Sequence, residues 1–151
     1  MKYLFILISF LSFIQFSLAA EKTYTLQSGD ASLSVVKDGK RLNLQIGDAH
    51  YLSLNAPYVV TLEVNAETLN SYYSSVKEEK GSLVCVAKLK STHGTVFHVK
   101  DVFAPDTENH FRMDREVTIE KIGKGDDYFN SYFGLTLQRK TQIEDFEFFV
   151  P

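Results

Sequence analysis

The sequence has little of several residue types that mark specialised classes of protein. Among 151 residues there are one cysteine, three prolines and no tryptophan, so neither a disulfide framework nor a proline-rich linker is encoded. Sixteen lysines and arginines stand against nineteen aspartates and glutamates, which leaves a net charge of −3 without any run of five like charges. Nucleic acid and anionic lipid surfaces bind clustered positive charge, so this composition argues against both as partners.

Signatures of catalysis and cofactor binding are also missing. The sequence contains no G-x-S-x-G elbow, Walker loop or dinucleotide fingerprint. Its four histidines have neither the helical i, i+4 spacing nor the cysteine partners of a zinc site. Asp106 with Glu108, and Asp126 with Asp127, lack the spacing of a calcium loop and are interpreted as solvated turns. We expect no catalytic residue, no metal site and no cofactor in this chain.

The only long apolar run lies at the start of the chain. Lys2 precedes the largely apolar stretch 3–16, and the small-residue segment 17–20 follows. This order is typical of a secretory signal peptide cleaved after Ala19 or Ala20, whereas a membrane-spanning helix needs about 20 apolar residues. We therefore expect residues 1–20 to be removed. The mature protein would be secreted or periplasmic, with no membrane association after cleavage.

The lone cysteine is predicted to be a core residue. Export leads to an oxidising compartment, but Cys85 has no partner within the chain, and a core of about 130 residues does not need a disulfide. Cys85 shares the apolar parity of its segment with Leu83, Ala87 and Leu89. Burial as a small hydrophobe is therefore favoured over a catalytic thiol, which would need a histidine partner and partial exposure.

The mature chain has the period-two pattern of β-strands, most clearly between Ala31 and Ile46. A two-residue type I′ turn at Asp38-Gly39 would place the apolar residues of both arms on one face. The expected pairs are Lys37 with Lys40, Val35 with Leu42, Leu33 with Leu44 and Ala31 with Ile46.

Further strands follow at short intervals. They are expected at Tyr51–Leu54, Tyr58–Val64, Ser82–Lys90, Thr95–Phe103, Phe111–Glu120 and Ser131–Gln138. Lys80-Gly81 and His93-Gly94 are predicted hairpin connections. Ala66–Lys80 is ambiguous between a helix and a short turn with a strand, and the strand is favoured because its serines and tyrosines are poor helix formers. About nine short strands without a clear helix predict an all-β antiparallel β-sandwich over residues 21–140, with a closed barrel as the alternative.

Two pairs of residues stand out as candidate sites. Adjacent strand residues face opposite ways, so at least one ring of Tyr72 and Tyr73 should face solvent, where it is a possible carbohydrate contact. Arg115 is the only charge on the apolar parity of its strand and needs a carboxylate partner if it is buried. Asp101 is the predicted partner, with Asp106 and Asp114 as competitors. We expect a structural ion pair between Asp101 and Arg115.

The second half of the chain carries a pattern found in a known class of domain. Gly94–Phe103, Phe111–Ile119 and Tyr128–Leu135 supply a Gly-Thr strand, an aspartate, a Phe-x-x-x-Arg-x-Val strand and a Phe-Asn-Ser-x-Phe strand. Over residues 80–151 this series resembles the N-terminal β-sandwich domain of bacterial secreted glycoside hydrolases. In those enzymes an (α/α)6-barrel with the catalytic acids follows the sandwich, so the resemblance implies no catalytic residue here.

The resemblance implies a non-catalytic accessory domain of a carbohydrate-active enzyme. Its partner would be a downstream catalytic domain of the same polypeptide, and a carbohydrate is the expected ligand. The aromatic run 146–151 would be partly exposed at a free end, so 141–151 is predicted to begin a linker and the chain to be a fragment. The alternative is a stand-alone secreted β-sandwich that binds a glycan or a protein by itself.

Overall fold

The computed structural model describes residues 22–39, 42–46, 49–53, 57–62, 67–133 and 136–137. The predicted signal peptide and the predicted linker at 141–151 lie outside these residues. The described part of the chain forms twelve strands and no helix, where about nine strands were predicted. It accordingly contains no helix of the length and apolarity that a membrane span requires.

All strand pairs are antiparallel, and the strands form three sheets. The five-stranded sheet has the order β1-β2-β3-β4-β12, with β1 (Thr23–Ser28), β2 (Ala31–Val36), β3 (Leu42–Ile46), β4 (Ala49–Ser53) and β12 (Thr136–Leu137). The four-stranded sheet has the order β10-β9-β8-β7, with β7 (Ser75–Glu79), β8 (Ser82–Lys90), β9 (Val96–Pro105) and β10 (Phe111–Lys121). The three-stranded sheet has the order β11-β5-β6, with β5 (Tyr58–Leu62), β6 (Glu67–Asn70) and β11 (Tyr128–Ser131).

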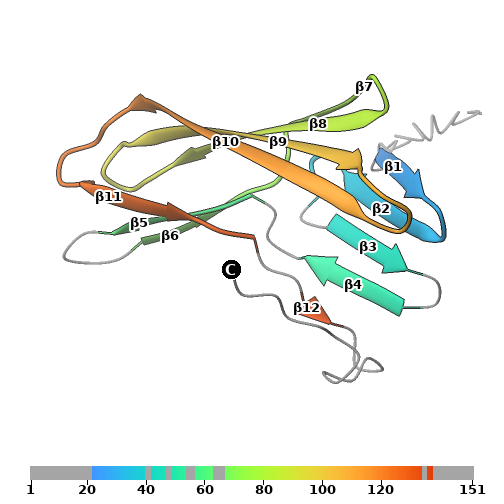
Figure 1. The fold of residues 1–151 in the computed structure, drawn as a ribbon. Coiled ribbons are helices and arrows are strands. Elements are labelled where there is room, and N and C mark those ends of the chain that lie inside the picture. Colours follow the sequence, from blue (N-terminus) through green and yellow to red (C-terminus); the bar gives the residue numbers. More distant parts are fainter. Residues whose placement is uncertain are drawn as a thin grey trace, which may run out of the picture.

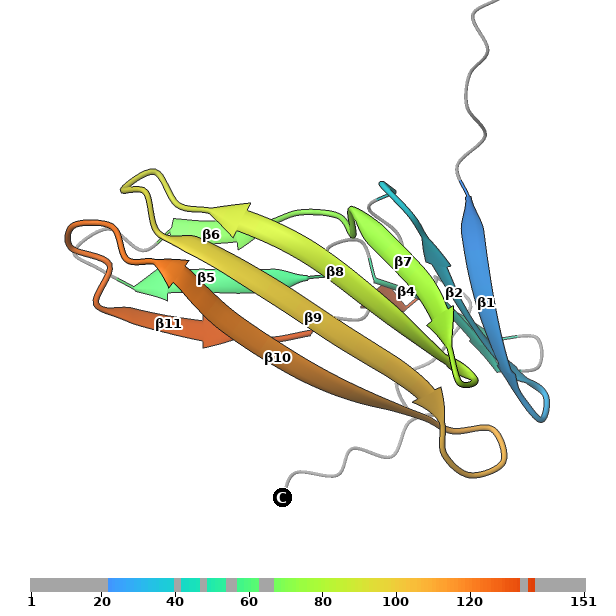
Figure 2. The same cartoon turned by 90° about the horizontal axis from the view of Figure 1, so that it is seen from above.

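The long strands β8, β9 and β10 run the length of the molecule. The three-stranded sheet lies under the end that carries the β8–β9 turn, and β1 to β4 lie at the other end (Figures 1 and 2). The packed antiparallel sheets confirm the predicted all-β sandwich. Strand alternation explains this architecture, because β8 buries every second side chain from Leu83 to Leu89 and leaves the others partly or fully exposed.

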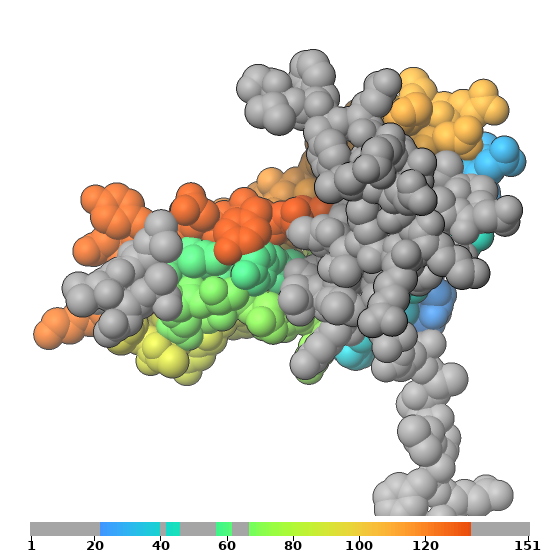
Figure 3. Space-filling model, turned by 90° about the horizontal axis from the view of Figure 1, so that it is seen from below, coloured from blue at the N-terminus to red at the C-terminus, as the bar shows by residue number. Residues whose placement is uncertain are grey.

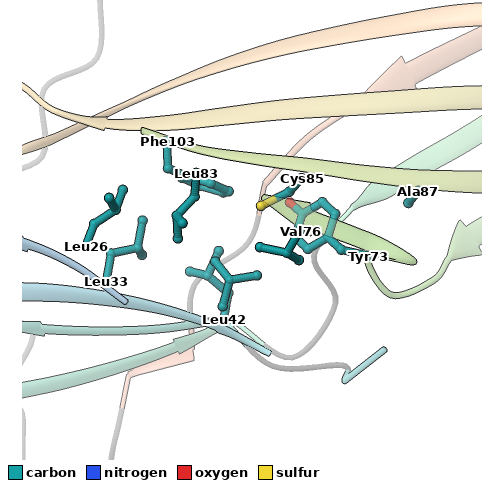
Figure 4. Packing of buried hydrophobic residues seen from close by; sticks show 10 residues of the cluster. Leu26, Leu33, Leu42, Tyr73, Val76, Leu83, Cys85, Ala87 and Phe103 are labelled. Carbon is teal, nitrogen blue, oxygen red and sulfur yellow. The ribbon is translucent and has the colours of Figure 1, made fainter. Parts of the chain in front are cut away.

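Two apolar clusters fill the space between the sheets. The first lies against the five-stranded sheet and contains Leu26, Leu33, Val35, Leu42, Tyr73, Val76, Leu83, Cys85, Ala87 and Phe103 (Figure 4). The second lies over the three-stranded sheet and contains Val59, Leu69, Leu89, Phe97 and Val99. Burial, helped by the Asp101 carboxylate, raises the pKa of the Cys85 thiol to about 12. The predicted burial of Cys85 is confirmed, and the alternative of a reactive thiolate is wrong.

The β2–β3 hairpin has the predicted register but a different turn. Val35 pairs with Leu42, Leu33 with Leu44 and Ala31 with Ile46. The predicted type I′ turn is wrong, because Asp38 has a positive φ of 59° and Gly39 does not. The Gly39 N–H donates to the Val36 carbonyl at 3.2 Å, so the chain turns one residue earlier than predicted. The predicted partner of Lys37, Lys40, lies outside the described residues.

Gly39 is still required, for space and not for its φ. A Cβ atom there would lie 2.5 Å from Cγ1 of Val36, closer than side-chain carbons approach. The type I′ pattern occurs instead at Lys80-Gly81, where φ is 50° and 77° and where Glu79 pairs with Ser82. Both Lys80-Gly81 and His93-Gly94 connect hairpins, as predicted.

Two other segments refine the sequence interpretation. The ambiguous stretch 66–80 contains the strands β6 and β7, so its helical spacing did not determine its structure. The predicted final strand at Ser131–Gln138 has different bounds. β11 begins three residues earlier, at Tyr128, and only Thr136–Leu137 are described as strand further on. The earlier start places Tyr128, Phe129 and Asn130 in a strand and not in the loop before it.

Candidate functional site

The inner face of the four-stranded sheet contains the predicted ion pair. Asp101 on β9 and Arg115 on β10 are direct cross-strand partners. Arg115 binds the carboxylate with two nitrogens, Nε to Oδ1 at 2.6 Å and Nη2 to Oδ2 at 2.6 Å. The Asp101 side chain is fully buried, and that of Arg115 is 10% exposed. The competitor Asp114 faces the other way and pairs with the exposed Arg112.

Tyr73 completes this buried network. It lies between β6 and β7, and its hydroxyl donates to Oδ2 of Asp101. Its ring packs edge-on against Phe103, with centroids 6.5 Å apart, inside the first apolar cluster (Figure 4). Burial, followed by the charge of Asp101, raises the pKa of Tyr73 far above its usual value. Burial alone would lower the pKa of Arg115, but its hydrogen bonds to Asp101 and the charge of that carboxylate raise it.

The expectation that at least one ring of Tyr72 and Tyr73 faces solvent is confirmed, but burial excludes Tyr73 as a carbohydrate contact, and contact at Tyr72 stays a prediction. Tyr73 is 1% exposed, so its ring cannot touch a ligand in solvent. Its neighbour Tyr72 is 42% exposed, so the two rings do face opposite ways, although the predicted reason is wrong because both residues lie between β6 and β7 and not in a strand. Tyr73 faces inward, where its hydroxyl donates a hydrogen bond to the buried Asp101 carboxylate. The sequence does not show this long-range contact.

The third guanidinium nitrogen of Arg115, Nη1, contacts the end of β11 and the residue that follows it. Nη1 donates to the Tyr132 carbonyl at 3.0 Å and to Oγ of Ser131 at 3.3 Å. The Tyr132 N–H in turn donates to the Tyr58 carbonyl at 3.2 Å, and the two tyrosine rings meet nearly perpendicular with centroids 4.2 Å apart. A single guanidinium thus joins the buried network of one sheet to the exposed Tyr132 and, through it, to the half-buried Tyr58 of another sheet.

The alternation of β11 sorts its side chains between the core and solvent. Phe129 faces the second apolar cluster and packs against Phe97, with ring centroids 5.4 Å apart, although 38% of it remains exposed at the sheet edge. Tyr128 and Asn130 point the other way, onto the outer face of the three-stranded sheet, where Asn130 pairs with Val60. Tyr128 is 73% exposed and Tyr132 is 45% exposed. Seen from below, β11 in orange lies beside β5 and β6 in green on this surface (Figure 3).

We call this outer surface the tyrosine face. Its described members are Tyr58, Val60, Thr68, Asn70, Tyr128, Asn130 and Tyr132. None of these described side chains carries a charge. Val60 is only 7% exposed and is the apolar residue between the larger side chains of the face. The face thus combines the exposed rings of Tyr128 and Tyr132 with amides and hydroxyls on a sheet of three short strands.

The acidic turn at Asp126 is used internally. Oδ2 accepts hydrogen bonds from the Ser91 hydroxyl at 2.6 Å and from the Thr95 hydroxyl, and Oδ1 lies 3.3 Å from His93 Nδ1. The hydroxyl hydrogen bonds, that of Ser91 first, lower the pKa of the Asp126 carboxyl. This carboxylate ties the β10–β11 loop to the β8–β9 turn. Among the described residues, no three His, Cys, Asp or Glu side chains gather in a way that would hold a metal ion.

Two open grooves lie between strand edges of the described structure. One of about 480 Å³ separates β1 from β7, and one of about 280 Å³ separates β6 from β8. The second includes Thr68 and Asn70, so it borders the tyrosine face. Both grooves are open to solvent and neither encloses a cofactor-sized ligand on all sides.

Comparison of the chain with models of known families, with curated proteins and with solved structures found no match. The sequence interpretation missed Tyr58, Tyr128 and Tyr132, although a signal was present. Tyr128, Asn130 and Tyr132 occupy alternate positions, as the exposed face of a strand requires, but the strand was predicted to start at Ser131.

Proposed function

We propose that this protein is a non-catalytic carbohydrate-binding β-sandwich, acting as an accessory domain of a secreted glycoside hydrolase. The observation that carries the proposal is the tyrosine face, where Tyr58, Tyr128 and Tyr132 gather on one sheet surface whose described members carry no charge. Phenol rings offer an apolar face for the C–H side of a sugar ring and a hydroxyl for its polar rim. Asn70 and Asn130 add amide donors and acceptors beside them.

The lack of charge on the tyrosine face favours a neutral ligand. Recognition of an acidic sugar or of a phosphate would call for an arginine or lysine, whose charge-assisted hydrogen bonds are the strong ones. None is present among the described members of the face. A neutral glycan matches rings and amides without charges.

The spacing of the rings favours an extended chain over a single sugar. Tyr128 and Tyr132 are four residues apart along β11 and its continuation, which corresponds to about 13 Å at the usual rise of a strand. A monosaccharide does not cover that length. An oligosaccharide lying along β11 would contact Tyr128 at one end and the Tyr132–Tyr58 pair at the other.

The accessory role is supported by the resemblance of the second half of the chain to sandwich domains that precede a catalytic barrel. Downstream coding sequence tests this part of the proposal. An open reading frame beyond the codon for Pro151 that encodes α-helical hairpins would support it. A stop codon there, in a protein that still binds glycan, would favour the alternative of a stand-alone binding module.

Glycan binding itself is tested by calorimetric titration of residues 21–151 with a panel of neutral and acidic oligosaccharides. We expect binding to a neutral glycan, weakened about tenfold or more by Tyr128→Ala, since exposed aromatic anchors dominate such sites. Tyr128→Phe should retain most of the affinity because the ring remains. Lys100→Ala, on the opposite outer face, is the matched control and should not change affinity. Absence of binding to every glycan would contradict the proposed function.

A further inference from the structure

We infer that Arg115 is a positioning residue for the tyrosine face: it transmits the fixed geometry of the buried Asp101 carboxylate to the backbone of Tyr132. The role of this contact in ligand binding rests on the proposed function. The positioning itself does not, because it can be measured without any ligand. Arg115 is a largely buried charge, and apolar packing alone gives no reason for a charge at this position.

The buried end of this connection is fixed from several sides. Asp101 lies in the middle of β9, directly between Cys85 on β8 and Arg115 on β10. Tyr73 donates to Oδ2 from a different part of the chain. Nε and Nη2 of Arg115 hold both carboxylate oxygens at 2.6 Å, which sets the plane of the guanidinium. With that plane set, the direction of Nη1 is set as well.

The exposed end is held by side-chain packing on both sides of Tyr132, because Phe129 packs against Phe97 and Phe133 packs against the first apolar cluster, but its backbone has fewer fixed bonds. β11 has four residues, all of them exposed, and it is an edge strand whose described partner is β5. Tyr132 follows the last strand residue. Its N–H is held by the Tyr58 carbonyl and its C=O by Arg115, so the second bond comes from another sheet. Short edge segments open readily, and a fixed bond from the core reduces that freedom.

The position of Tyr132 decides whether two rings act together. Its ring meets that of Tyr58 nearly edge-on, at a centroid distance of 4.2 Å. If the Tyr132 backbone moves, the ring leaves Tyr58 and one end of the tyrosine face loses its shape. A preformed face binds more tightly because ordering it does not have to accompany binding. Arg115 therefore acts on the ligand site without touching the ligand.

This role requires arginine and not merely positive charge. The planar guanidinium binds Asp101 with one edge while Nη1 points toward Tyr132. A lysine ammonium is a point charge at the end of a flexible chain and could satisfy Asp101 without reaching Tyr132. Arg115→Lys thus separates neutralisation of the buried carboxylate from positioning, whereas Arg115→Met removes both.

The test is amide hydrogen exchange of the mature chain, resolved for β11 through Tyr132, with the core strands β8 and β9 as internal reference. We expect Arg115→Lys to speed exchange at Tyr132 about tenfold or more, the effect of losing one charge-assisted hydrogen bond, with little change in β8 and β9. Arg112→Lys is the matched control. It alters an exposed pair on the same strand, 3.0 Å from Asp114, and should change neither region.

Near-ultraviolet circular dichroism gives an independent readout, because the perpendicular contact of Tyr58 and Tyr132 should contribute a tyrosine band that Arg115→Lys reduces. If Arg115→Met fails to fold, Arg115→Lys alone decides the question. Unchanged exchange at Tyr132, or equal acceleration in β8, β9 and β11, would overturn the inference, since the residue would then be only a stability determinant. Unchanged glycan affinity despite faster exchange would overturn its role in binding.

The two proposals fail in distinguishable ways. If the wild-type chain binds no glycan but Arg115→Lys still frees Tyr132, the proposed function is wrong and the positioning stands. If the wild-type chain binds glycan and Arg115→Lys changes neither exchange nor affinity, the function stands and the positioning is wrong. Faster exchange together with weaker affinity supports both.

Discussion

The two outer faces of this sandwich are built from the same alternation of strands but carry opposite chemistry. The outer face of the four-stranded sheet is charged, with Lys77, Lys88, Lys100, Arg112, Asp114, Glu116 and Glu120 all exposed. The tyrosine face, on the three-stranded sheet, has no charge among its described members. We define the first surface as the charged face. Because both belong to one short chain, the contrast is not a consequence of overall composition.

The charged face has the features of a surface that remains in water. Glu116 stands opposite Lys100 across β9 and β10, and Glu120 contacts both Lys88 and His98. Mixed charges on an edge strand such as β10 also discourage pairing with another sheet. The described members of the tyrosine face carry no such charges. Its most exposed ring, that of Tyr128, is 73% exposed. Exposed aromatic rings gathered on one surface are typical of an interaction site.

The largest expected effect compares the two arginines of β10, one facing each way. Removing either member of the Asp101–Arg115 pair should lower the free energy of unfolding by about 3–5 kcal/mol, because the other charge is left buried and unpaired. The exposed Arg112–Asp114 pair, whose side chains are both 61% exposed, should contribute about 0–1 kcal/mol. Denaturant unfolding of Asp101→Asn, Arg115→Met and the double variant measures the coupling.

The same double-mutant cycle at Arg112 and Asp114 is the control. A coupling energy near zero at Asp101 and Arg115, or equal couplings for the two pairs, would show that the inward and outward faces of β10 do not differ in this respect. Since the removed partner leaves a buried charge behind, the double variant should be more stable than the sum of the single effects suggests.

The next effect concerns Asp126, which joins the β10–β11 loop to the β8–β9 turn of the four-stranded sheet. Asp126→Asn should lower stability by about 1.5–3 kcal/mol at neutral pH, since it weakens the hydrogen bonds from Ser91 and Thr95 to a charged acceptor. Folding lowers the pKa of Asp126, so this stabilisation is present above the ordinary aspartate value of about 3.9. It is lost as the pH falls through the lowered pKa.

Urea denaturation between pH 7 and pH 2 checks this sign. The stability difference between wild type and Asp126→Asn should be constant above about pH 5 and should shrink below about pH 4. A difference that grows as the pH falls would contradict the assignment, because it would mean that the carboxyl is stabilised in its protonated form.

A third prediction provides a reference that lies on neither face. Gly39→Val, in the β2–β3 hairpin, should lower stability by about 1–3 kcal/mol, because its Cβ would lie 2.5 Å from Val36 Cγ1. Glycan affinity should remain that of the wild type at temperatures where the variant is folded. A parallel loss of affinity would indicate that the tyrosine face responds to any loss of stability, and the contrast with Arg115→Lys would then disappear.

Much of this architecture was predictable because strand side chains alternate with period two. The register of β2 with β3 followed from placing apolar residues opposite one another, and the Asp101–Arg115 pair followed from a single charge on an apolar parity. Both inferences use neighbours that hairpin connections bring together. Runs of β-branched residues such as Val59, Val60 and Thr61 likewise favoured strands.

The tyrosine face was not predicted, because it depends on strands that no hairpin connection brings together. β11 pairs with β5, about seventy residues earlier in the chain, so no short turn defines its register. Without that register, the exposed parity of Tyr128 and Asn130 was not assigned. Tyr73 shows the same limitation, since its burial depends on a carboxylate 28 residues away. Long-range partners, and not local pattern, decided which aromatic residues face solvent.

The smallest expected effect lies within the charged face and tests whether its ion pairs have any structural purpose. Lys88 and Glu120 meet at 2.8 Å with side chains 55% and 49% exposed, and the hydrogen bond from Lys88, followed by that from His98, lowers the pKa of Glu120. Solvent screens such pairs, so Lys88→Ala should leave the unfolding midpoint unchanged within error. Any difference seen at low ionic strength should vanish near 1 M salt, where the Debye length is about 3 Å. The loss of stability in Arg115→Met should persist at that salt concentration, because its partner is fully buried. A Lys88→Ala effect as large and as salt-resistant as that of Arg115→Met would mean that the charged face, too, is part of what holds the sandwich together, and the distinction between the two faces would have to be drawn on binding alone.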